Sequence, residues 1–488
     1  MSVSPLQLAE ILRHKKDFVW LDSLIPQASS NPKEQGLSLL AADPDLIIEG
    51  GPHDWPLLKK ELSKRLATED WRLKKNLSLS SHGKATSNPV NNRELTTESF
   101  SHKEKSHFKL AQADEMQEAD GRQQRSVCGD NKAVSSEATQ PIAASAEFQG
   151  RFPGAAIGFF RYDGSFRFGF YEKVYRHLAT EKKSEWLTPL APLEIQKSTP
   201  HKKVKPLHFK HNMTREKFCE IVREAQREIA LGNIYQICLA HSLQASCEQD
   251  SWPLYLSLRQ HSPAPFAAYL QAGEDVILSS SPECFLKMEG RHILTRPIKG
   301  TRPRGKTSIE DNREAALLQA SSKENAELVM ITDLERNDLG KVCDYGSVIT
   351  SQLLHLEAYP QVFHLVSTVE GRLRQEISHV EAVAACFPGG SISGAPKKRA
   401  MELIHSLESL PRGLFTGAIG YFGFDGTSQF NIAIRTLLLS RGIAQFHVGA
   451  GITNDSIPEQ EWEETLHKAA GILIATRSRC CAAVKVEN

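Results

Sequence analysis

Apolar side chains recur at helical spacing in several stretches of this chain. In residues 214–231, Phe218, Ile221, Ala225 and Ile229 fall on one face of a predicted helix. Gly232 and Asn233 follow and favour the end of that helix. The helices predicted in this way span residues 214–231, 311–321, 323–336, 378–385, 396–410 and 458–476.

Short apolar runs alternate with these helices and predict strands. The expected strands are 18–23, 46–48, 154–160, 234–241, 275–278, 291–297, 416–424, 430–439 and 443–448. Helices and strands alternate densely from residue 212 to residue 475, without a visible internal repeat. The pattern therefore predicts a main domain over 212–475.

The hydrophobic pattern is lost between residues 73 and 147, where Ser, Asn, Lys, Glu and Gln dominate. Such a composition has too little apolar surface to offset its ordering entropy, so we predict a disordered insertion. It divides an N-terminal region into residues 1–72 and 148–190. A Pro- and Lys-rich linker is expected at 191–211, and a C-terminal tail at 476–488.

Charge and composition exclude several classes of protein. Lysine plus arginine is 59 against 58 acidic residues, which gives no electrostatic footprint for nucleic acid or an anionic membrane. No apolar run approaches the ~20 residues that span a bilayer, and the first residues contain no signal-peptide core. We expect a soluble, cytoplasmic protein.

The nine cysteines predict neither a zinc site nor a disulfide framework, because they form no CxxC pair and are irregularly spaced. They are expected to be small buried hydrophobes in a reducing compartment.

Lys299 stands between Ile298 and Gly300, after the apolar run 292–295. A lysine at a strand end is expected to be partly desolvated, which would lower its pKa from about 10.4 toward neutrality. A neutral amine is a nucleophile, and the neighbouring glycine lets a substrate approach the backbone. The alternative is a solvated lysine in a turn.

Two pairs of glutamates share a three-residue spacing, which places each pair on one helix face. They are Glu324 with Glu327, and Glu461 with Glu464. Both lie beside apolar stripes, where carboxylates need a cation or protons. Their oxygens suit Mg²⁺. The alternative is ordinary solvated glutamates.

Glu283 follows Pro282 at the end of an apolar strand and could present a carboxylic acid there, unless it is a solvated turn residue. The glycine-rich segment 389–397 has GxxxxG spacing but lacks the Lys-Ser/Thr of a nucleotide-binding loop. Its backbone N–H groups could instead hold a carboxylate.

Arg435, on an apolar strand, needs an acidic partner, either a ligand carboxylate or an internal salt bridge. The predicted glycine turn Gly449-Ala450-Gly451 is a second candidate for anion binding. His364 and Tyr421, each taken alone, suggest satisfied core residues.

The order of these motifs resembles the chorismate-utilising enzymes, and within them the aminodeoxychorismate synthase component I branch. The motifs are 281–283, 297–301, 333–339, 387–397, 417–421 and 449–452. The resemblance is strong over 212–475 and weaker over 1–70 and 148–190. It implies an α+β fold, a four-layer α/β/β/α sandwich with the site between two antiparallel sheets.

The resemblance also implies roles for the site residues. Glu327 and Glu464 match direct Mg²⁺ ligands, supported by Glu324 and Glu461, and the metal would hold the ring carboxylate of chorismate. The remaining positions match groups around the substrate: Arg435 and the backbone of Gly449, Ala450 and Gly451 at the enolpyruvyl carboxylate, Lys468 near the ring carboxylate, and Gly300, Thr301, His364 and Tyr421 along the pocket.

Lys299 separates the branches of the family, because anthranilate synthases typically have alanine at this position. The resemblance implies that Lys299 attacks C2 of chorismate while Glu283 protonates the departing C4 hydroxyl. Gln236 stands where isochorismate and salicylate synthases have a lysine that activates water, so the expected nucleophile is ammonia. A separate glutamine amidotransferase subunit is implied as its source.

We therefore expect an aminodeoxychorismate synthase component I acting in p-aminobenzoate and folate synthesis. The alternatives are an anthranilate synthase component I and a non-catalytic chorismate-binding homologue. Leu21-Asp22-Ser23 is too short a signal to decide whether tryptophan binds the N-terminal region.

Overall fold

The computed structural model describes residues 4–23, 36–66, 153–179, 184–186, 203–359 and 361–478. The predicted insertion at 73–147 lies outside these residues, as do most of the predicted linker and the C-terminal tail from residue 479. Contacts divide the chain into a compact unit of residues 1–70 and 150–488 and a second unit of residues 71–149. Every helix and strand named below belongs to the first unit.

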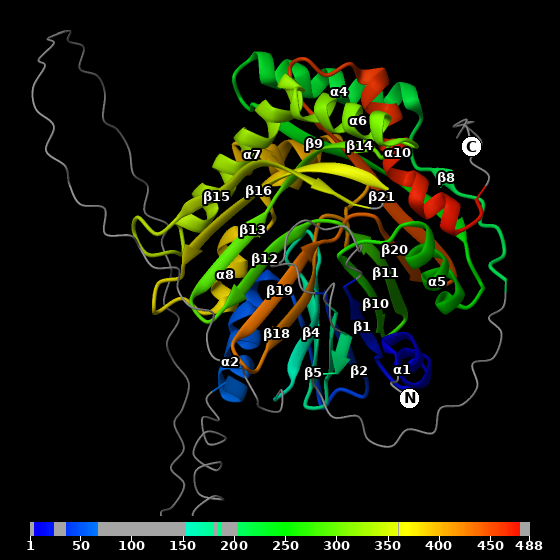
Figure 1. Ribbon diagram of the computed structural model, residues 1–488, viewed down its shortest axis with the longest axis vertical. Helices are drawn as coiled ribbons and strands as arrows, with labels where there is room; N and C mark the ends of the chain where they lie inside the picture. Colours follow the sequence, from blue (N-terminus) through cyan, green and yellow to red (C-terminus); the bar gives the residue numbers. More distant parts are fainter. Residues whose placement is uncertain are drawn as a thin grey trace, which may run out of the picture. The chain divides into compact units, whose positions relative to one another are not determined.

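Two antiparallel sheets form this unit (Figure 1). The first sheet has eleven strands in the order β17-β9-β21-β20-β11-β10-β1-β2-β6-β7, with β8 paired to β9. Its strands are β1 (Val19–Asp22), β2 (Gly36–Ala41), β6 (Tyr175–Ala179), β7 (Ser184–Trp186), β8 (Lys210–His211), β9 (Gln236–Ser246), β10 (Phe266–Ala272), β11 (Asp275–Ser281), β17 (Gly394–Ala395), β20 (Thr436–Ser440) and β21 (Ile443–Ile452).

The second sheet has ten strands in the order β14-β16-β13-β12-β19-β18-β4-β5-β3, with β15 paired to β16. Its strands are β3 (Leu46–Gly50), β4 (Ala155–Phe160), β5 (Phe166–Tyr171), β12 (Cys284–Glu289), β13 (His292–Arg296), β14 (Ile298–Pro303), β15 (Ile349–Ala358), β16 (Val362–Arg372), β18 (Ala418–Gly423) and β19 (Thr427–Ile432).

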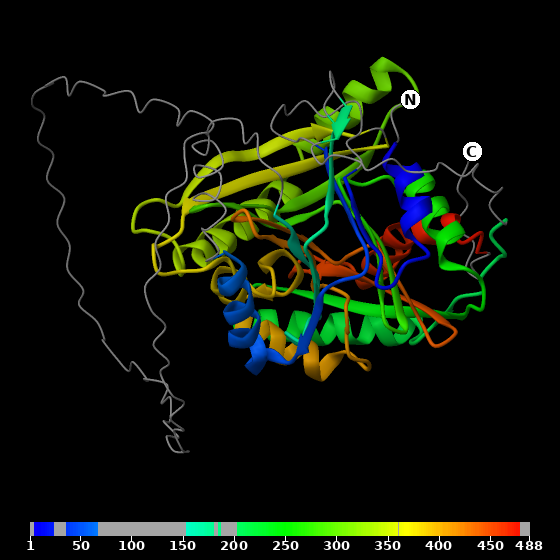
Figure 2. The same cartoon turned by 90° about the horizontal axis from the view of Figure 1, so that it is seen from below.

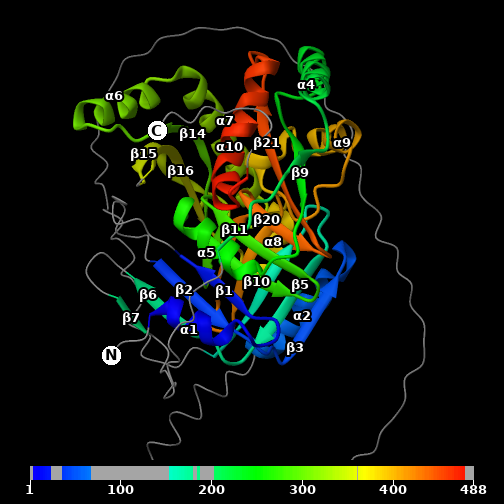
Figure 3. The ribbon, with the colours of Figure 1, turned by 90° about the vertical axis from the view of Figure 1, so that its right-hand side faces the viewer.

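Several helices begin at side chains that cap their free N–H groups, whereas the helices after Pro396 and Ile457 have no such cap. Thr214 accepts from the backbone N–H of Lys217, and Ser321 from that of Glu324. The helices are α1 (Pro5–Leu12), α2 (Trp55–Leu66), α4 (Arg215–Ala230), α5 (Ser251–His261), α6 (Ser308–Gln319), α7 (Ser322–Gly340), α8 (His379–Cys386), α9 (Lys397–Leu407) and α10 (Pro458–Ala475). Figure 3 shows α4, α6, α7, α9 and α10 together at one end of the unit, away from α1 and α2.

Alternation along the strands separates two faces of each sheet. In β4, Ile157 and Phe159 join Leu270 and Ile277 of the first sheet in a core between the sheets. Phe160, the next residue, points to the other face, where the second sheet packs against α2 and α8. The first sheet packs against α1, α5 and α10. The predicted four-layer α/β/β/α fold is therefore confirmed, and Figure 2 shows the same unit from below.

Each sheet combines strands from segments that are far apart in the sequence. β1 pairs with β10, register Trp20 to Tyr269, and β4 pairs with β18, register Gly158 to Gly420. The strands before residue 180 therefore extend both sheets at one end, continuing from β10 in the first and from β18 in the second, with β3 at the edge.

Most predicted elements are present, but one strand prediction and one turn prediction are wrong. The apolar run 430–439 is not one strand: it contains the end of β19 in one sheet and most of β20 in the other. Arg435, at φ 49°, stands where the chain crosses between the sheets. The predicted turn Gly449-Ala450-Gly451 lies within β21, paired with Ala240, Leu239 and Cys238 of β9.

The end of the predicted linker is also packed more closely than expected. Leu207 and Phe209 are buried in the core beneath α5 and α10. Among the described cysteines, five are buried, Cys238 is partly exposed and all are unpaired, as predicted. Within the described ranges, no helix is long and apolar enough to cross a membrane.

Candidate active site

Lys299 is the second residue of β14, and a bulge separates it from Thr301 in the pairing with β16. Gly300 makes this bulge with φ 76°, a conformation that side chains disfavour. A Cβ atom there would lie 2.9 Å from Leu318 Cδ1 and 3.2 Å from Glu324 Oε2. The glycine therefore lets the first turn of α7 approach the strand that carries the lysine.

The Lys299 amine lies where the two sheets meet. Its Nζ is 3.8 Å from Glu327 Oε2, and its side chain is 17% exposed. A Cβ atom on Gly451 of β21 would lie 3.0 Å from this Nζ and 2.6 Å from Gln236 Nε2. Gln236 and Gly451 belong to the first sheet, so the amine is reached from both sheets and from α7.

The prediction of a lowered pKa for Lys299 is wrong. Burial acts to lower this pKa, but the carboxylates of Glu327, Glu464 and Glu283, together with Cys238, outweigh burial and raise it. These carboxylates come from α7, α10 and the β11–β12 connection, and their convergence is not visible in the sequence. Lys299 is desolvated as expected, but its partners keep it protonated.

Glu283 lies between β11 and β12 and is only 5% exposed, so the solvated alternative is wrong. Burial raises the pKa of its carboxyl group, against a hydrogen bond from Ser391 and the charge of Lys299, which lower it. A carboxyl group with a raised pKa near a buried lysine can deliver a proton.

The four glutamates face one another from α7 and α10, and three of them have a lysine partner. Glu327 pairs with Lys299, Glu464 with Lys468 at 2.6 Å, and Glu461 with Lys323 at 3.6 Å. Burial raises the pKa of Glu327 and of Glu461. Burial acts the same way on Glu464, but Lys468 outweighs it and the pKa is lowered. Sequence reasoning missed Lys323, although it directly precedes Glu324.

The oxygen atoms of these four carboxylates are ligands of the kind that a hard divalent cation prefers. Glu461 is 97% buried, and its Oε2 has no hydrogen-bond partner among the residues that the structure describes. Burial of Glu327 and Glu461 beside further carboxylates disfavours their charged forms, which a cation would restore. As the side chains lie, no three of the described carboxylate, histidine or cysteine groups are close enough together to hold a metal ion directly. Lysines supply the positive charge instead.

Three further candidates are Thr301, His364 and Arg435. His364 Nδ1 is 2.9 Å from Thr301 Oγ1, and burial, aided by Arg435, lowers the pKa of His364 to about 3. The Arg435 guanidinium forms no hydrogen bond or ion pair with any residue that the structure describes, and it senses the charge of Glu283. The internal salt bridge considered from sequence is therefore not formed, and the guanidinium is available to an anion.

Lys468 and Tyr421, two further predicted site residues, have the following surroundings. Lys468 Nζ donates to the carbonyl of Gly449 at 2.9 Å, so that backbone oxygen is already satisfied. Tyr421 of β18 is buried in the core between the sheets, and burial raises its pKa to about 12, with Asp425 as its first charged neighbour. Its charged neighbours include Asp425, Arg176 and Glu289. Its place along the substrate pocket stays a prediction.

The glycine-rich segment 389–397 already holds a carboxylate from this chain. The N–H of Gly390 donates to Glu335 Oε1 at 2.9 Å, and Lys397 pairs with Asp338. Burial, followed by Asp338, raises the pKa of Glu335 to about 7. The segment therefore anchors Ser391 against Glu283, and Glu335 is a supporting residue that the sequence pattern did not single out.

Arg412 is a second supporting residue that sequence reasoning missed. It is buried, and all five of its N–H donors find acceptors: both oxygens of Glu408, the carbonyls of Cys238 and Ile392, and Thr416 Oγ1. Arg412 therefore connects two parts of the site: strand β9, which lies beside Lys299, and the segment 389–397, which contacts Glu283. Such a network fixes the distance between the amine and the acid.

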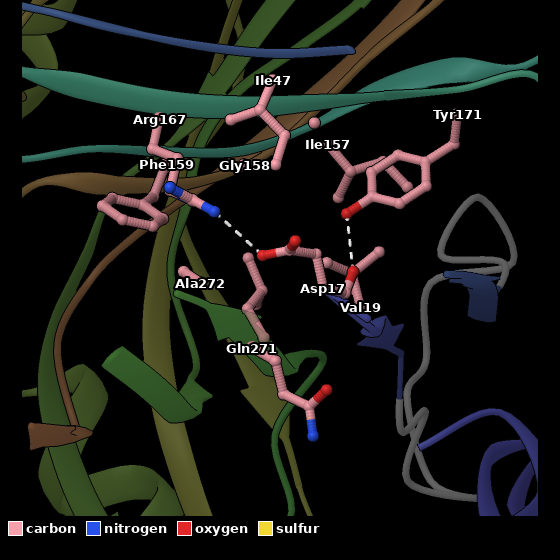
Figure 4. Close-up of a pocket in the computed structure, with 12 residues that line it drawn as sticks. Asp17, Val19, Ile47, Ile157, Gly158, Phe159, Arg167, Tyr171, Gln271 and Ala272 are labelled. Carbon is pink, nitrogen blue, oxygen red and sulfur yellow. Dashed lines mark hydrogen bonds and ion pairs between the residues drawn. The ribbon is translucent and has the colours of Figure 1, made fainter. Parts of the chain in front are cut away.

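A cavity of about 10 Å³ lies elsewhere between the sheets (Figure 4). Arg167 pairs with Asp17 at 2.9 Å beside it, and the Tyr171 hydroxyl donates to the carbonyl of Asp17. It has room for about one water molecule. None of the candidate site residues lines it, so it forms no part of the candidate active site.

A model of the family described as chorismate binding enzyme matches residues 74–474. The chain is 44% identical over 267 residues to anthranilate synthase component 1 of Thermus thermophilus, covering 55% of this chain and 58% of the relative. It is 40% identical over 290 residues to aminodeoxychorismate synthase component 1 of Bacillus subtilis, covering 59% and 61%. The matched region spans about three fifths of these two curated relatives.

Solved structures are similar as well. Anthranilate synthase component I from Streptococcus pneumoniae has a TM-score of 0.59 at 30% identity, covering 66% of this chain and 81% of that one. A putative 2,3-dihydroxybenzoate-specific isochorismate synthase from Bacillus anthracis has a TM-score of 0.61 at 17% identity, covering 94% and 96%. The second likeness concerns the fold alone.

Proposed function

The chain belongs to the chorismate binding enzyme family, and on that premise we propose that it converts chorismate and ammonia to 4-amino-4-deoxychorismate, for p-aminobenzoate and folate synthesis. Curated relatives with 40% to 45% identity include both aminodeoxychorismate and anthranilate synthases, so identity alone favours neither. The observation that carries the proposal is Lys299: a buried amine, reached from both sheets, beside a buried carboxylic acid.

The proposed reaction consists of two allylic displacements. Lys299 first passes a proton to Glu283, and its neutral amine then forms a bond to C2 of chorismate, the ring double bond shifts, and the C4 hydroxyl leaves as water with that proton. Ammonia then forms a bond to C4, the double bond shifts back, and the C2–N bond to Lys299 breaks. The enolpyruvyl group stays in place, and Glu283 regains a proton from the incoming ammonia.

The other groups would bind and orient the substrate. The Arg435 fork, which has no partner in the described part of the chain, suits the enolpyruvyl carboxylate, with the backbone of Gly449, Ala450 and Gly451 on β21 in support. His364, neutral because of its low pKa, can hydrogen-bond without adding charge, and Lys468 would lie near the ring carboxylate. Mg²⁺ held by Glu327 and Glu464, with Glu324 and Glu461 in support, would supply positive charge for the ring carboxylate.

Ammonia is the proposed nucleophile because Gln236, at the start of β9, cannot act as a general base toward water. We infer that a separate glutamine amidotransferase subunit supplies it.

Tight packing of Gln236 and Lys299 over Gly451 leaves no room for a larger side chain at that glycine.

Anthranilate synthase component I is the second candidate, supported by the relative from Thermus thermophilus. In that case ammonia adds at C2, pyruvate is lost, and Lys299 has no covalent role. The two candidates therefore differ in their products.

The test is product identification by mass spectrometry with purified protein, chorismate, Mg²⁺ and ammonium salt at alkaline pH, where more of the Lys299 amine is neutral. An amino product that retains the enolpyruvyl group supports the proposal. Anthranilate with pyruvate replaces it with the second candidate. The absence of any product from chorismate and ammonium would favour a non-catalytic homologue.

A further inference from the structure

Lys323 is the one lysine of the glutamate cluster for which the proposed chemistry has no role. It is the second residue of α7, and its side chain is 50% exposed. Its ammonium lies 3.6 Å from Glu461 Oε1, on α10. It also interacts electrostatically with Glu327, Glu464 and Glu324, so a single cation senses all four carboxylates.

The position of Lys323 is unfavourable for the helix itself. The first turn of a helix carries partial positive charge, which favours anions and disfavours cations. Burial also acts to lower the pKa of Lys323, yet Glu461 and the other carboxylates outweigh burial and raise it. The cluster, and not the helix, therefore stabilises the charge at this place.

The three lysines of the cluster differ in how firmly they are held. Lys299 is largely buried on β14, and Lys468 is tied to both Glu464 and the carbonyl of Gly449. Lys323 makes no hydrogen bond through Nζ to any described residue, and half of its side chain is in solvent. It can leave the cluster by side-chain rotation alone.

We propose that Lys323 is an internal counter-cation, which neutralises the glutamate cluster while no divalent cation is bound and swings into solvent when one binds. The inference rests on the proposed Mg²⁺ site. Glu461 offers the incoming ion a buried oxygen without a partner, while its other oxygen faces Lys323. Lys323 therefore competes with the metal and weakens its binding.

The test compares Mg²⁺ affinity by titration calorimetry on the full chain at low ionic strength. Lys323→Met removes the charge and keeps a side chain of similar length, and we expect Mg²⁺ to bind on the order of three- to tenfold more tightly. Lys323→Arg keeps the charge and should bind Mg²⁺ as the wild type does. The gain of Lys323→Met should shrink as salt is added.

Lys341→Met is the matched control. Lys341 lies at the other end of α7, is 48% exposed and pairs with Asp338, so its removal should leave Mg²⁺ affinity unchanged. Equal or weaker Mg²⁺ binding by Lys323→Met would overturn the proposal. If neither the wild type nor the variant binds Mg²⁺, the metal site and this inference both fail. The product assay is independent of these outcomes, since it identifies the reaction whatever the role of Lys323.

Discussion

Two regions of the second sheet are built in opposite ways. On the face toward α2, an aromatic core (Trp55, Phe160, Phe168, Phe422 and Phe430) packs ring against ring, with Trp55 and Phe160 stacked at 4.4 Å. At the β14 end, the same sheet meets a cluster of charged side chains that are neutralised mostly in pairs. In the first region the rings need no partner of opposite charge, whereas in the second each charge depends on one.

The comparison teaches how one sheet carries both stability and chemistry. Removing an aromatic ring leaves a cavity, which costs stability wherever it lies. Removing one partner of a buried pair leaves an uncompensated charge, which changes the protonation and ligand affinity of the neighbours. Substitutions in the two regions should therefore affect different measurements.

The largest effect is expected from Lys299→Ala. Without the amine, formation of 4-amino-4-deoxychorismate should fall by roughly 10³-fold or more, because the covalent route is lost. The measurement is the initial rate by chromatography with mass detection. Lys287→Ala, an exposed lysine on β12 of the same sheet, is the control. Unchanged turnover in Lys299→Ala would remove covalent catalysis from the proposal.

Phe160→Ala tests the aromatic core. The loss of this ring, which contacts Trp55, Phe168 and Phe430, should cost about 3–5 kcal/mol of unfolding free energy. Urea denaturation measures it, and the turnover per folded molecule should stay unchanged. Leu57→Ala, on an exposed position of α2, should cost little. A loss of turnover without a loss of stability would break the distinction between the two regions.

Glu327→Gln tests the charged cluster. Mg²⁺ affinity should fall at least about tenfold, because the proposed direct carboxylate ligand is replaced by a neutral amide. Titration calorimetry measures it, with Glu463→Gln as control, since Glu463 is exposed on α10 beside Glu464. Equal Mg²⁺ affinity in Glu327→Gln and the wild type would take Glu327 out of the proposed metal site.

The smallest effect concerns His241, which stacks on Trp462 at 4.5 Å behind α10. Burial, followed by His211 and His447, lowers its pKa to about 3, against about 6.5 in the unfolded chain. Between these two pH values His241 is protonated in the unfolded chain but neutral in the folded one. Its stabilising contribution is therefore fully present above pH 6.5 and is lost as the pH falls. The expected contribution is about 1.4 kcal/mol per pH unit.

Urea denaturation midpoints between pH 7 and pH 5 measure this effect. His241→Phe keeps a ring against Trp462 and should show a shallower loss of stability over that range. His405→Gln, at an exposed position of α9, should follow the wild type. Parallel pH curves for His241→Phe and the wild type would contradict the assignment.

Sequence predicted the elements of 212–475 well where one periodicity ran through each segment. It failed at 430–439, because the apolar run continues while the chain changes sheet at Arg435. At Gly449–Gly451 the glycines indicated a turn, but pairing with β9 keeps them extended. Tertiary contacts decided both cases, and local composition does not contain them.

The candidate site shows the same limit. The residue types of Lys299, Glu283 and the two glutamate pairs could be found from the sequence, because motif order and spacing mark them. The direction of the Lys299 pKa shift could not, since it depends on carboxylates from α7 and α10, more than a hundred residues apart in the chain. Arg412 was missed because its role lies in five acceptors that only the fold assembles.

The place of β1 and β4 within the sheets bears on how this protein can be divided or recombined. A fragment starting at residue 212 would lose the partners of β10 and β18, and two unpaired strand edges with apolar faces would be exposed. Such a fragment should associate through those edges instead of folding as a minimal enzyme. Fusion partners and affinity tags therefore belong at the chain ends, and shuffling with relatives should exchange the segments before residue 180 and after residue 212 together.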